Sequence, residues 1–246
     1  MIITENNIKN FETYIEIDVL EKFGIKILGT KKKYGCIKQK KAHDIINDFS
    51  LNNKILVSTH QTHSDNIVFI KDFSQTYFEN TDGLLSSNTQ AALLVKYADC
   101  LPIFIYDEDS QIFGAVHSGW QGSYQEIIIK AIKKIPNKID LNRIHIVFGV
   151  GISCKNYEVQ EDFYLKFKNK FPLSIIEQAF SRINNKIYFD NQLFNYYLLK
   201  DFGIPEKNIY RNNLCTFDGD TFHSYRRDKE LSGRNGGIIY KIRKAD

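Results

Sequence analysis

Five short apolar segments between residues 55 and 116 limit the folds available to this chain more than any other feature. They are rich in β-branched residues, have the length of buried strands, and cover residues 55–59, 66–70, 91–95, 102–106 and 112–116. Further strand patterns lie at 11–17, 143–150 and 237–242, and helical patterns at 41–49, 123–135, 162–171 and 191–202. Because strands and helices do not alternate in strict β-α-β order, we expect an α/β (α+β-like) fold with mixed β-sheets, and neither a barrel nor a simple doubly wound sheet.

Two of the expected helices carry recognisable capping residues. Ser123 and Glu126 form the S-x-x-E pattern of a capping box, followed by isoleucines at helical spacing. Asp190 is the expected N-cap of the helix at 191–202, and Gly203 is expected to end that helix.

Composition indicates a folded globular protein. Of 246 residues, 43% are hydrophobic and 25% are charged, which excludes a disordered or low-complexity chain. No linker rich in Pro, Gly or Ser divides the sequence, so we expect one domain over residues 1–246. The four cysteines form no C-x-x-C pair, which argues against a zinc ribbon and against a disulfide framework.

Charge and hydrophobicity argue against nucleic-acid and membrane partners. The net charge is only +4, and the lysines at 31–33 predict a solvated face. The longest apolar stretch, 91–106, is interrupted by Lys96, Asp99 and Pro102 and therefore cannot span a membrane. The first residues lack the pattern of a signal peptide, so we expect a cytoplasmic protein with reduced thiols.

Three segments place metal-ligating or nucleophilic side chains at the ends of expected strands. His60 and His63 come just after the strand at 55–59, and Cys100 lies in a short break between two strands. His117 ends another strand and precedes a glycine-rich turn. Since α/β folds place their sites in loops beyond strand ends, these residues are candidates for a functional site.

These residues suit two chemistries. His63, Cys100 and His117 would hold one zinc ion, because two imidazoles and a thiolate suit zinc and leave a fourth position open for a water molecule. Alternatively, Cys100 and His117 would act as a thiolate–imidazole pair, with an Asp or Asn as the orienting group. Spacing alone does not choose between them, since the three residues are far apart in sequence.

Clustered arginines form a further candidate site. The chain has only seven arginines, and Arg226, Arg227 and Arg234 fall within nine positions. Planar guanidinium groups bind phosphate or carboxylate in bidentate geometry, so these residues are candidates for phosphate binding. The alternative is a buried structural network between arginine and aspartate.

Several separated motifs, in this order, resemble those of one family over about residues 50–240. The family is the laccase-domain family, also called the polyphenol oxidase or purine nucleoside phosphorylase family, in its bacterial YfiH-like form. The motifs are Gln61-Thr62-His63, Thr81-Asp82-Gly83-Leu84, Ala98-Asp99-Cys100-Leu101-Pro102, Ala115-Val116-His117-Ser118-Gly119-Trp120 and Tyr225-Arg226-Arg227-Asp228.

The resemblance implies a four-layer α/β/β/α fold and a zinc site made of His63, Cys100 and His117. It also implies phosphorolysis of adenosine, inosine, guanosine or methylthioadenosine, and deamination of adenosine. In the deamination, Asp99 or His60 would orient or shuttle a proton. One departure concerns phosphate: Gln121 stands where the family commonly has an arginine, so Arg226, Arg227 or Arg234 would have to take its place. The expected partners are therefore purine nucleosides and phosphate, in a monomer or a homodimer.

Other functions remain open from the sequence. A multicopper oxidase needs a cluster fed by His-x-His pairs, and this chain has six histidines and no such pair. A single copper ion in place of zinc would give weak polyphenol oxidation. A Cys–His amide hydrolase with Cys100 as nucleophile would suit the editing of peptidoglycan precursors, to which the family has been linked. A binding protein without turnover is the remaining alternative.

Overall fold

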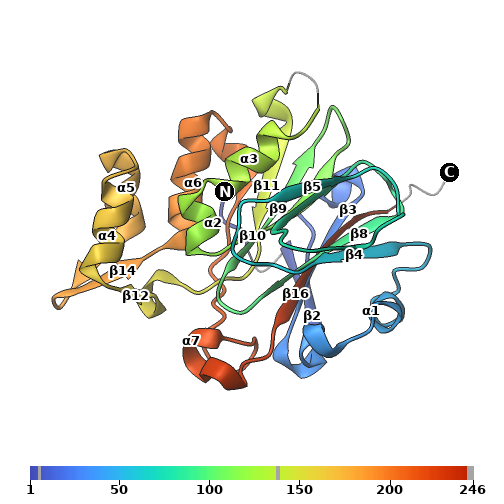
Figure 1. Cartoon of the computed structure of the whole chain (residues 1–246), viewed down its shortest axis with the longest axis horizontal. Coiled ribbons are helices and arrows are strands. Elements are labelled where there is room, and N and C mark those ends of the chain that lie inside the picture. The colour runs from blue at the N-terminus through green and yellow to red at the C-terminus, as the bar shows by residue number, and fades with distance from the viewer. Residues whose placement is uncertain (5–6, 137–138, 243–246) are drawn as a thin grey trace.

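Two β-sheets that pack face to face form the centre of the protein (Figure 1). The computed structural model describes residues 1–4, 7–136 and 139–242. The first sheet has the strand order β1 (Ile8–Asn10), β2 (Tyr14–Ile17), β3 (Ile25–Thr30), β16 (Asn235–Lys241), β8 (Ala91–Tyr97), β4 (Ile55–Thr59) and β6 (Tyr77–Phe78). The second has the order β15 (Ile209–Tyr210), β11 (Ile144–Phe148), β9 (Leu101–Asp107), β10 (Phe113–Ser118), β7 (Gly83–Ser86) and β5 (Ile67–Ile70).

Both sheets mix parallel and antiparallel neighbours, as expected from the sequence. In the first sheet β4 runs parallel to β8, whereas β16 pairs antiparallel with both β3 and β8. In the second sheet β5 runs parallel to β7, whereas β9 and β10 are antiparallel. Between the sheets, Ile27, Leu93 and Ile239 of the first belong to one buried cluster with Phe104 and Phe113 of the second. Burial of these apolar side chains from both sheets stabilises the double layer.

Helices cover the two outer faces of this double layer. The outer face of the seven-stranded sheet is covered by α1 (Ala42–Asp48) and two 3-10 turns, Lys32–Tyr34 and Ile37–Gln39. The outer face of the six-stranded sheet carries α2 (Trp120–Tyr124), α3 (Ile127–Lys133) and α6 (Asn191–Phe202) (Figure 1). The order of layers is therefore α/β/β/α, which confirms the fold class expected from the sequence.

A small third sheet extends the helical side of the molecule (Figure 1). Its strands are β12 (Glu158–Val159), β14 (Lys186–Phe189) and β13 (Phe180–Ile183), and it is accompanied by α4 (Glu161–Lys168) and α5 (Leu173–Ala179). Aromatic side chains of these elements join the core that α3 and α6 form on the six-stranded sheet. The short helix α7 (Tyr225–Asp228) comes before β16 in the chain and lies at one end of the two packed sheets (Figure 1).

The capping box expected at Ser123 and Glu126 is wrong. Glu126 has a φ of 60°, in the left-handed region, and separates α2 from α3. Ser123 lies inside α2, fully buried, and its hydroxyl donates to Asn191 Oδ1 at 2.6 Å. The caps of α6 are confirmed, because Asp190 accepts a hydrogen bond from the Leu193 N–H and Gly203 ends the helix with a φ of 107°.

No helix in residues 1–4, 7–136 and 139–242 is both long enough and apolar enough to cross a membrane.

Candidate metal centre

Two loops and the end of a strand bring His63, Cys100 and His117 together. His63 follows β4, Cys100 lies in the turn between β8 and β9, and His117 is at the end of β10. Their ligand atoms all lie within 4.8 Å of one another. Cys100 Sγ is 3.7 Å from His63 Nε2, and the two imidazole rings meet edge to face with centroids 5.0 Å apart. The structure thus assembles the three residues that the sequence analysis selected as metal ligands.

Strand pairing and unusual backbone conformations produce this convergence. In the β9–β10 pair His117 lies opposite Pro102, so Cys100 projects just beyond the end of the ladder. Both Asp99 and His63 have left-handed backbone, with φ of 84° and 58°. Such conformations are costly for residues other than glycine and are concentrated at functional sites. The surrounding hydrogen bonds maintain them here.

Asp99 fastens the turn that carries Cys100. Its carboxylate accepts a hydrogen bond from the Thr216 hydroxyl and another from the Arg226 backbone N–H, each at 2.6 Å. Its backbone carbonyl accepts from the Ile152 N–H. Asp99 thus ties its own turn to three distant segments, those that carry Ile152, Thr216 and Arg226.

Gly119 allows the ligands to approach one another. A Cβ atom at this position would lie 2.9 Å from Cys100 Sγ and 3.0 Å from His63 Cδ2. Any larger residue would push on two ligands, so this glycine is required for close approach.

Asp82 anchors two of the three candidate ligands. This fully buried carboxylate accepts hydrogen bonds from the backbone N–H groups of Thr62, His63 and Ser64, and from the Ser64 hydroxyl, at 2.8–3.2 Å. It also accepts a bond from His117 Nδ1 at 2.8 Å. Burial alone would raise the pKa of the Asp82 carboxyl, but His117 and the other donors lower that pKa. With Nδ1 bound in this way, Nε2 of His117 remains for Cys100 or a metal.

The electrostatics favour a thiolate at Cys100. Burial alone would raise the pKa of this thiol, but His117 and His63 outweigh it and lower the pKa to about 6. Burial alone would lower the pKa of His117, but Cys100 and Asp82 outweigh it and raise the pKa to about 9. Before any metal binds, Cys100 and His117 therefore form a thiolate–imidazolium pair. The thiolate is the form that binds metals and the form that attacks electrophiles.

Replacing Asp82 with asparagine is expected to weaken the binding of added zinc by about 10- to 100-fold, as for other groups that orient metal-binding histidines. The amide has one acceptor oxygen where the carboxylate serves five donors. Competition with a chelator measures the dissociation constant. Asp65→Asn is the matched control, because this carboxylate of the same loop pairs with Lys130 at the surface. Equal zinc affinity in Asp82→Asn and wild type would contradict the anchoring role.

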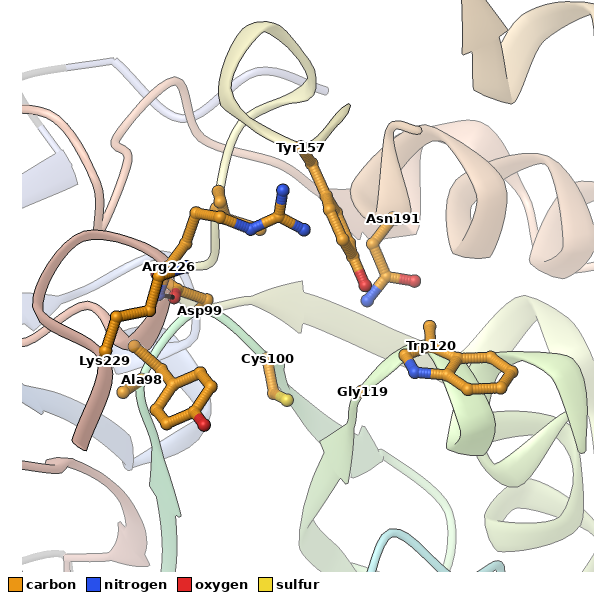
Figure 2. Close-up of a pocket in the computed structure, with 11 residues that line it drawn as sticks. Ala98, Asp99, Cys100, Gly119, Trp120, Tyr157, Asn191, Arg226 and Lys229 are labelled. Carbon is orange, nitrogen blue, oxygen red and sulfur yellow. Dashed lines mark hydrogen bonds between the residues drawn. The ribbon is translucent and has the colours of Figure 1, made fainter. Parts of the chain in front are cut away.

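Two pockets meet at Cys100. The first, of about 370 Å³, has aromatic and cationic side chains in its lining that include Trp120, Tyr157 and Arg226. Figure 2 shows Tyr157 and Cys100 pointing into this space, with Arg226 and Trp120 beside it. The second pocket, of about 570 Å³, is lined by all three candidate ligands and by the residues Lys38, Thr59, His60, Gln61, Tyr77, Lys96, Tyr97, Glu230 and Arg234. Ala98, Cys100 and Tyr225 line both pockets.

The candidate arginines take different places. Arg226 lines the first pocket, stacks its guanidinium 5.1 Å from the centre of the Tyr157 ring, and donates to the Glu158 carbonyl. Arg234 lines the second pocket. Arg227 lines neither: its guanidinium binds the Asp228 carboxylate and four backbone carbonyls, those of Thr216, Phe217, Gly219 and Phe222. The guanidinium of Arg227 therefore has a structural role, which is the alternative that the sequence left open, and it is not a candidate for phosphate binding.

The remaining candidates lie around the three ligands. His60 lines the second pocket outside the group of three and pairs through Nδ1 with Glu79 at 2.6 Å. Asp99 lines the first pocket, with both carboxylate oxygens engaged as described above. Gln121 is exposed and lines neither pocket.

Sequence reasoning gave no role to Asp82, Lys96 or Tyr157. Asp82 and Lys96 each had a visible signal, a charged residue next to or within an apolar strand. A charge in such a position is seldom tolerated unless it is paired or functional. Tyr157 had no such signal, because aromatic residues are common in cores and only the tertiary structure turns it toward Cys100.

Residues 37–241 match the family model described as multi-copper polyphenol oxidoreductase laccase. The chain belongs to this family. A purine nucleoside phosphorylase of Borreliella burgdorferi is 36% identical over 234 residues, which cover 94% of this chain and 97% of that protein. A purine nucleoside phosphorylase of Staphylococcus epidermidis is 35% identical over 157 residues, covering 62% of this chain and 57% of that protein. The family resemblance seen in the sequence motifs is thereby confirmed.

Solved structures of lower identity share the fold. The YfiH protein of Bacillus licheniformis superposes with a TM-score of 0.84 at 23% identity, covering 96% of this chain and 100% of that one. YlmD from Geobacillus stearothermophilus superposes with a TM-score of 0.81 at 19% identity, covering 96% and 99%.

Proposed function

We propose that this member of the laccase-like family is a zinc-dependent enzyme that cleaves purine nucleosides with phosphate. The observation that carries the proposal is the convergence of His63, Cys100 and His117 where two pockets meet. One pocket is available for each of two substrates. The phosphorylase names of the relatives from Borreliella burgdorferi and Staphylococcus epidermidis support the same substrates.

The donor set fits zinc. Two imidazole nitrogens and a thiolate are common zinc ligands, and a site with three protein ligands retains an open position. Asp82 holds His117 in the orientation that such a site needs, and the lowered pKa of Cys100 supplies the thiolate. When bound, zinc would supply a Lewis acid that polarises an oxygen of the substrate or activates water.

The first pocket is the proposed nucleoside site. The Tyr157 ring and the Arg226 guanidinium form a stacked pair at 5.1 Å, and Trp120 adds a second aromatic surface. Such flat groups stack with a purine, as they do with bases in nucleic-acid complexes. The ribose would then face Cys100, where the pockets join. In the reaction a phosphate oxygen bonds to the anomeric carbon while the glycosidic bond breaks, and the departing purine nitrogen takes up a proton.

Metal removal and reconstitution test the proposal. We expect zinc-loaded protein to convert adenosine and phosphate to adenine and ribose 1-phosphate, and chelator-treated protein to lose this activity until zinc is restored. Mass spectrometry identifies the products, and omission of phosphate separates phosphorolysis from deamination to inosine. Loading the chelator-treated protein with copper tests whether copper can replace zinc in this reaction. Undiminished turnover by the metal-free protein, or no product from the zinc-loaded protein, would contradict the proposal.

The thiolate–imidazolium pair supports one second candidate, a Cys–His amide hydrolase. In that case Cys100 would attack a carbonyl carbon and form an acyl-enzyme. Rapid covalent trapping of Cys100 by an electrophilic amide analogue, in active metal-free protein, would favour the hydrolase over the phosphorylase.

A further inference from the structure

We propose that the second pocket is a binding site for free inorganic phosphate, with Lys96, Lys38 and Arg234 as its cationic groups. The assignment rests on the proposed function, because phosphate is there the co-substrate. It moves phosphate recognition away from Arg226 and Arg227 and gives two lysines a role in binding.

Lys96 is the central residue of this assignment. It interrupts the buried strand β8, and its Nζ donates to the Thr59 carbonyl at 2.5 Å. Nζ also lies 5.5 Å from the centre of the Tyr77 ring. An ammonium group has three donors, and the structure pairs only one of them with an acceptor among the described residues. The others are available to a ligand in the pocket.

Gln61 fixes Lys96 relative to the candidate metal ligands. Its side-chain amide donates to the Lys96 carbonyl at 2.7 Å and accepts from the Lys96 N–H at 2.8 Å. Gln61 is two residues before His63, so the loop that carries this ligand is attached to the strand that carries the lysine. The ammonium and the ligand loop are therefore held in a fixed arrangement.

The pocket carries an excess of positive charge. Lys38, Lys96 and Arg234 line it, and Glu230 is the one carboxylate among its described lining residues. Glu230 accepts a hydrogen bond from the Tyr225 hydroxyl at 2.7 Å. Burial and the neighbouring Lys38 lower the pKa of Lys96, and Glu79 opposes them only in part. A bound dianion would relieve this repulsion, so the electrostatics favour phosphate over a neutral ligand.

The position of this pocket also favours phosphate here over the first pocket. His63, Cys100 and His117 all line the second pocket, whereas Cys100 alone of the three lines the first. Arg226 in the first pocket and Arg234 in the second are each already bonded to backbone carbonyls, so the two lysines of the second pocket carry the distinction. Phosphate in the second pocket would thus lie beside the three candidate ligands, while Cys100 also lines the proposed nucleoside site.

Lys96→Met tests the assignment. In zinc-loaded protein we expect it to weaken binding of inorganic phosphate, measured by calorimetry, and to raise the KM for phosphate by about tenfold or more, as expected when a charged hydrogen bond is lost. The KM for adenosine should change by less than about twofold. Lys96→Arg should restore most of the phosphate affinity. Lys41→Met is the matched control, because it removes an exposed lysine that lines neither pocket.

Lys38→Met provides an independent test, since this exposed side chain lines the pocket and its loss leaves the core intact. It should also raise the KM for phosphate. Unchanged phosphate binding in both Lys96→Met and Lys38→Met would overturn the assignment. Binding of adenosine 5′-monophosphate without binding of free phosphate would overturn it too, because the site would then recognise a nucleotide. Lys96-dependent phosphate binding without any turnover would support the site and contradict the proposed function.

Discussion

Cys100→Ala is expected to abolish stoichiometric zinc binding and to lower the rate of phosphorolysis by about a thousandfold or more. The thiolate is the one anionic ligand of the three, and metal catalysis commonly contributes several kcal/mol to the barrier. The fold should remain intact, because Cys100 is only partly buried and lies at the junction of two pockets.

Metal content by mass spectrometry, thermal denaturation and product formation together check this expectation. Cys154→Ala is the matched control, since this half-buried thiol contacts Ser181 and lines neither of the two pockets that meet at Cys100. We expect Cys154→Ala to bind zinc and to turn over like wild type. A Cys100→Ala protein that retained both zinc and activity would show that the metal centre lies elsewhere.

Phe167→Ala is expected to have the largest effect on stability, about 3–5 kcal/mol. Phe167 is fully buried in α4, and its ring centre lies 4.9–5.8 Å from those of five neighbouring phenylalanines: Phe163, Phe171, Phe180, Phe189 and Phe194. Truncation removes these contacts and leaves a cavity in the buried core. Urea denaturation measures the change in the free energy of unfolding.

The same substitution should reach the first pocket. Phe163 stacks on Phe167, and its ring centre lies 5.3 Å from that of Trp120 and 6.4 Å from that of Tyr157. We therefore expect Phe167→Ala to raise the KM for adenosine more than the KM for phosphate. Leu165→Ala on the same helix is the control: this side chain is 44% exposed, and its loss should change stability by less than about 0.5 kcal/mol. Similar stabilities of the two variants would contradict the packing argument.

Several strands of both sheets could be predicted from the sequence because burial on two faces leaves continuous apolar runs, but β3 and β7 were missed. The runs at 91–95, 102–106 and 112–116 correspond to β8, β9 and β10. The break between α2 and α3 could not be predicted, because Gln125 and Glu126 are good helix formers, whereas Glu126 adopts a left-handed φ of 60°.

The candidate site was predictable in part. Histidine and cysteine are recognised in a sequence as metal-ligating residues. The positions of His63, Cys100 and His117 at the ends of expected strands selected these three. Asp82 was not assigned a role, because a buried carboxylate is recognised only through the five donors that surround it. The clustering of Arg227 with Arg226 and Arg234 left both phosphate binding and a structural network open, because the carbonyls that its guanidinium binds come from a loop whose path the sequence does not reveal.

The anchoring of the ligands by Asp82 and Gly119 has a consequence for metal preference. Asp82 fixes the His63 loop through backbone N–H groups, and Gly119 keeps Cys100 and His63 in close approach. The ligand frame is therefore built by the protein before any ion arrives. We expect a preformed frame of two nitrogens and one sulfur to accept copper as well as zinc, since divalent copper generally binds nitrogen and sulfur donors more tightly than zinc does. We therefore expect the metal that occupies this frame to follow the supply of each ion, so that a copper-based family description and the proposed zinc-dependent activity would be two loadings of one site.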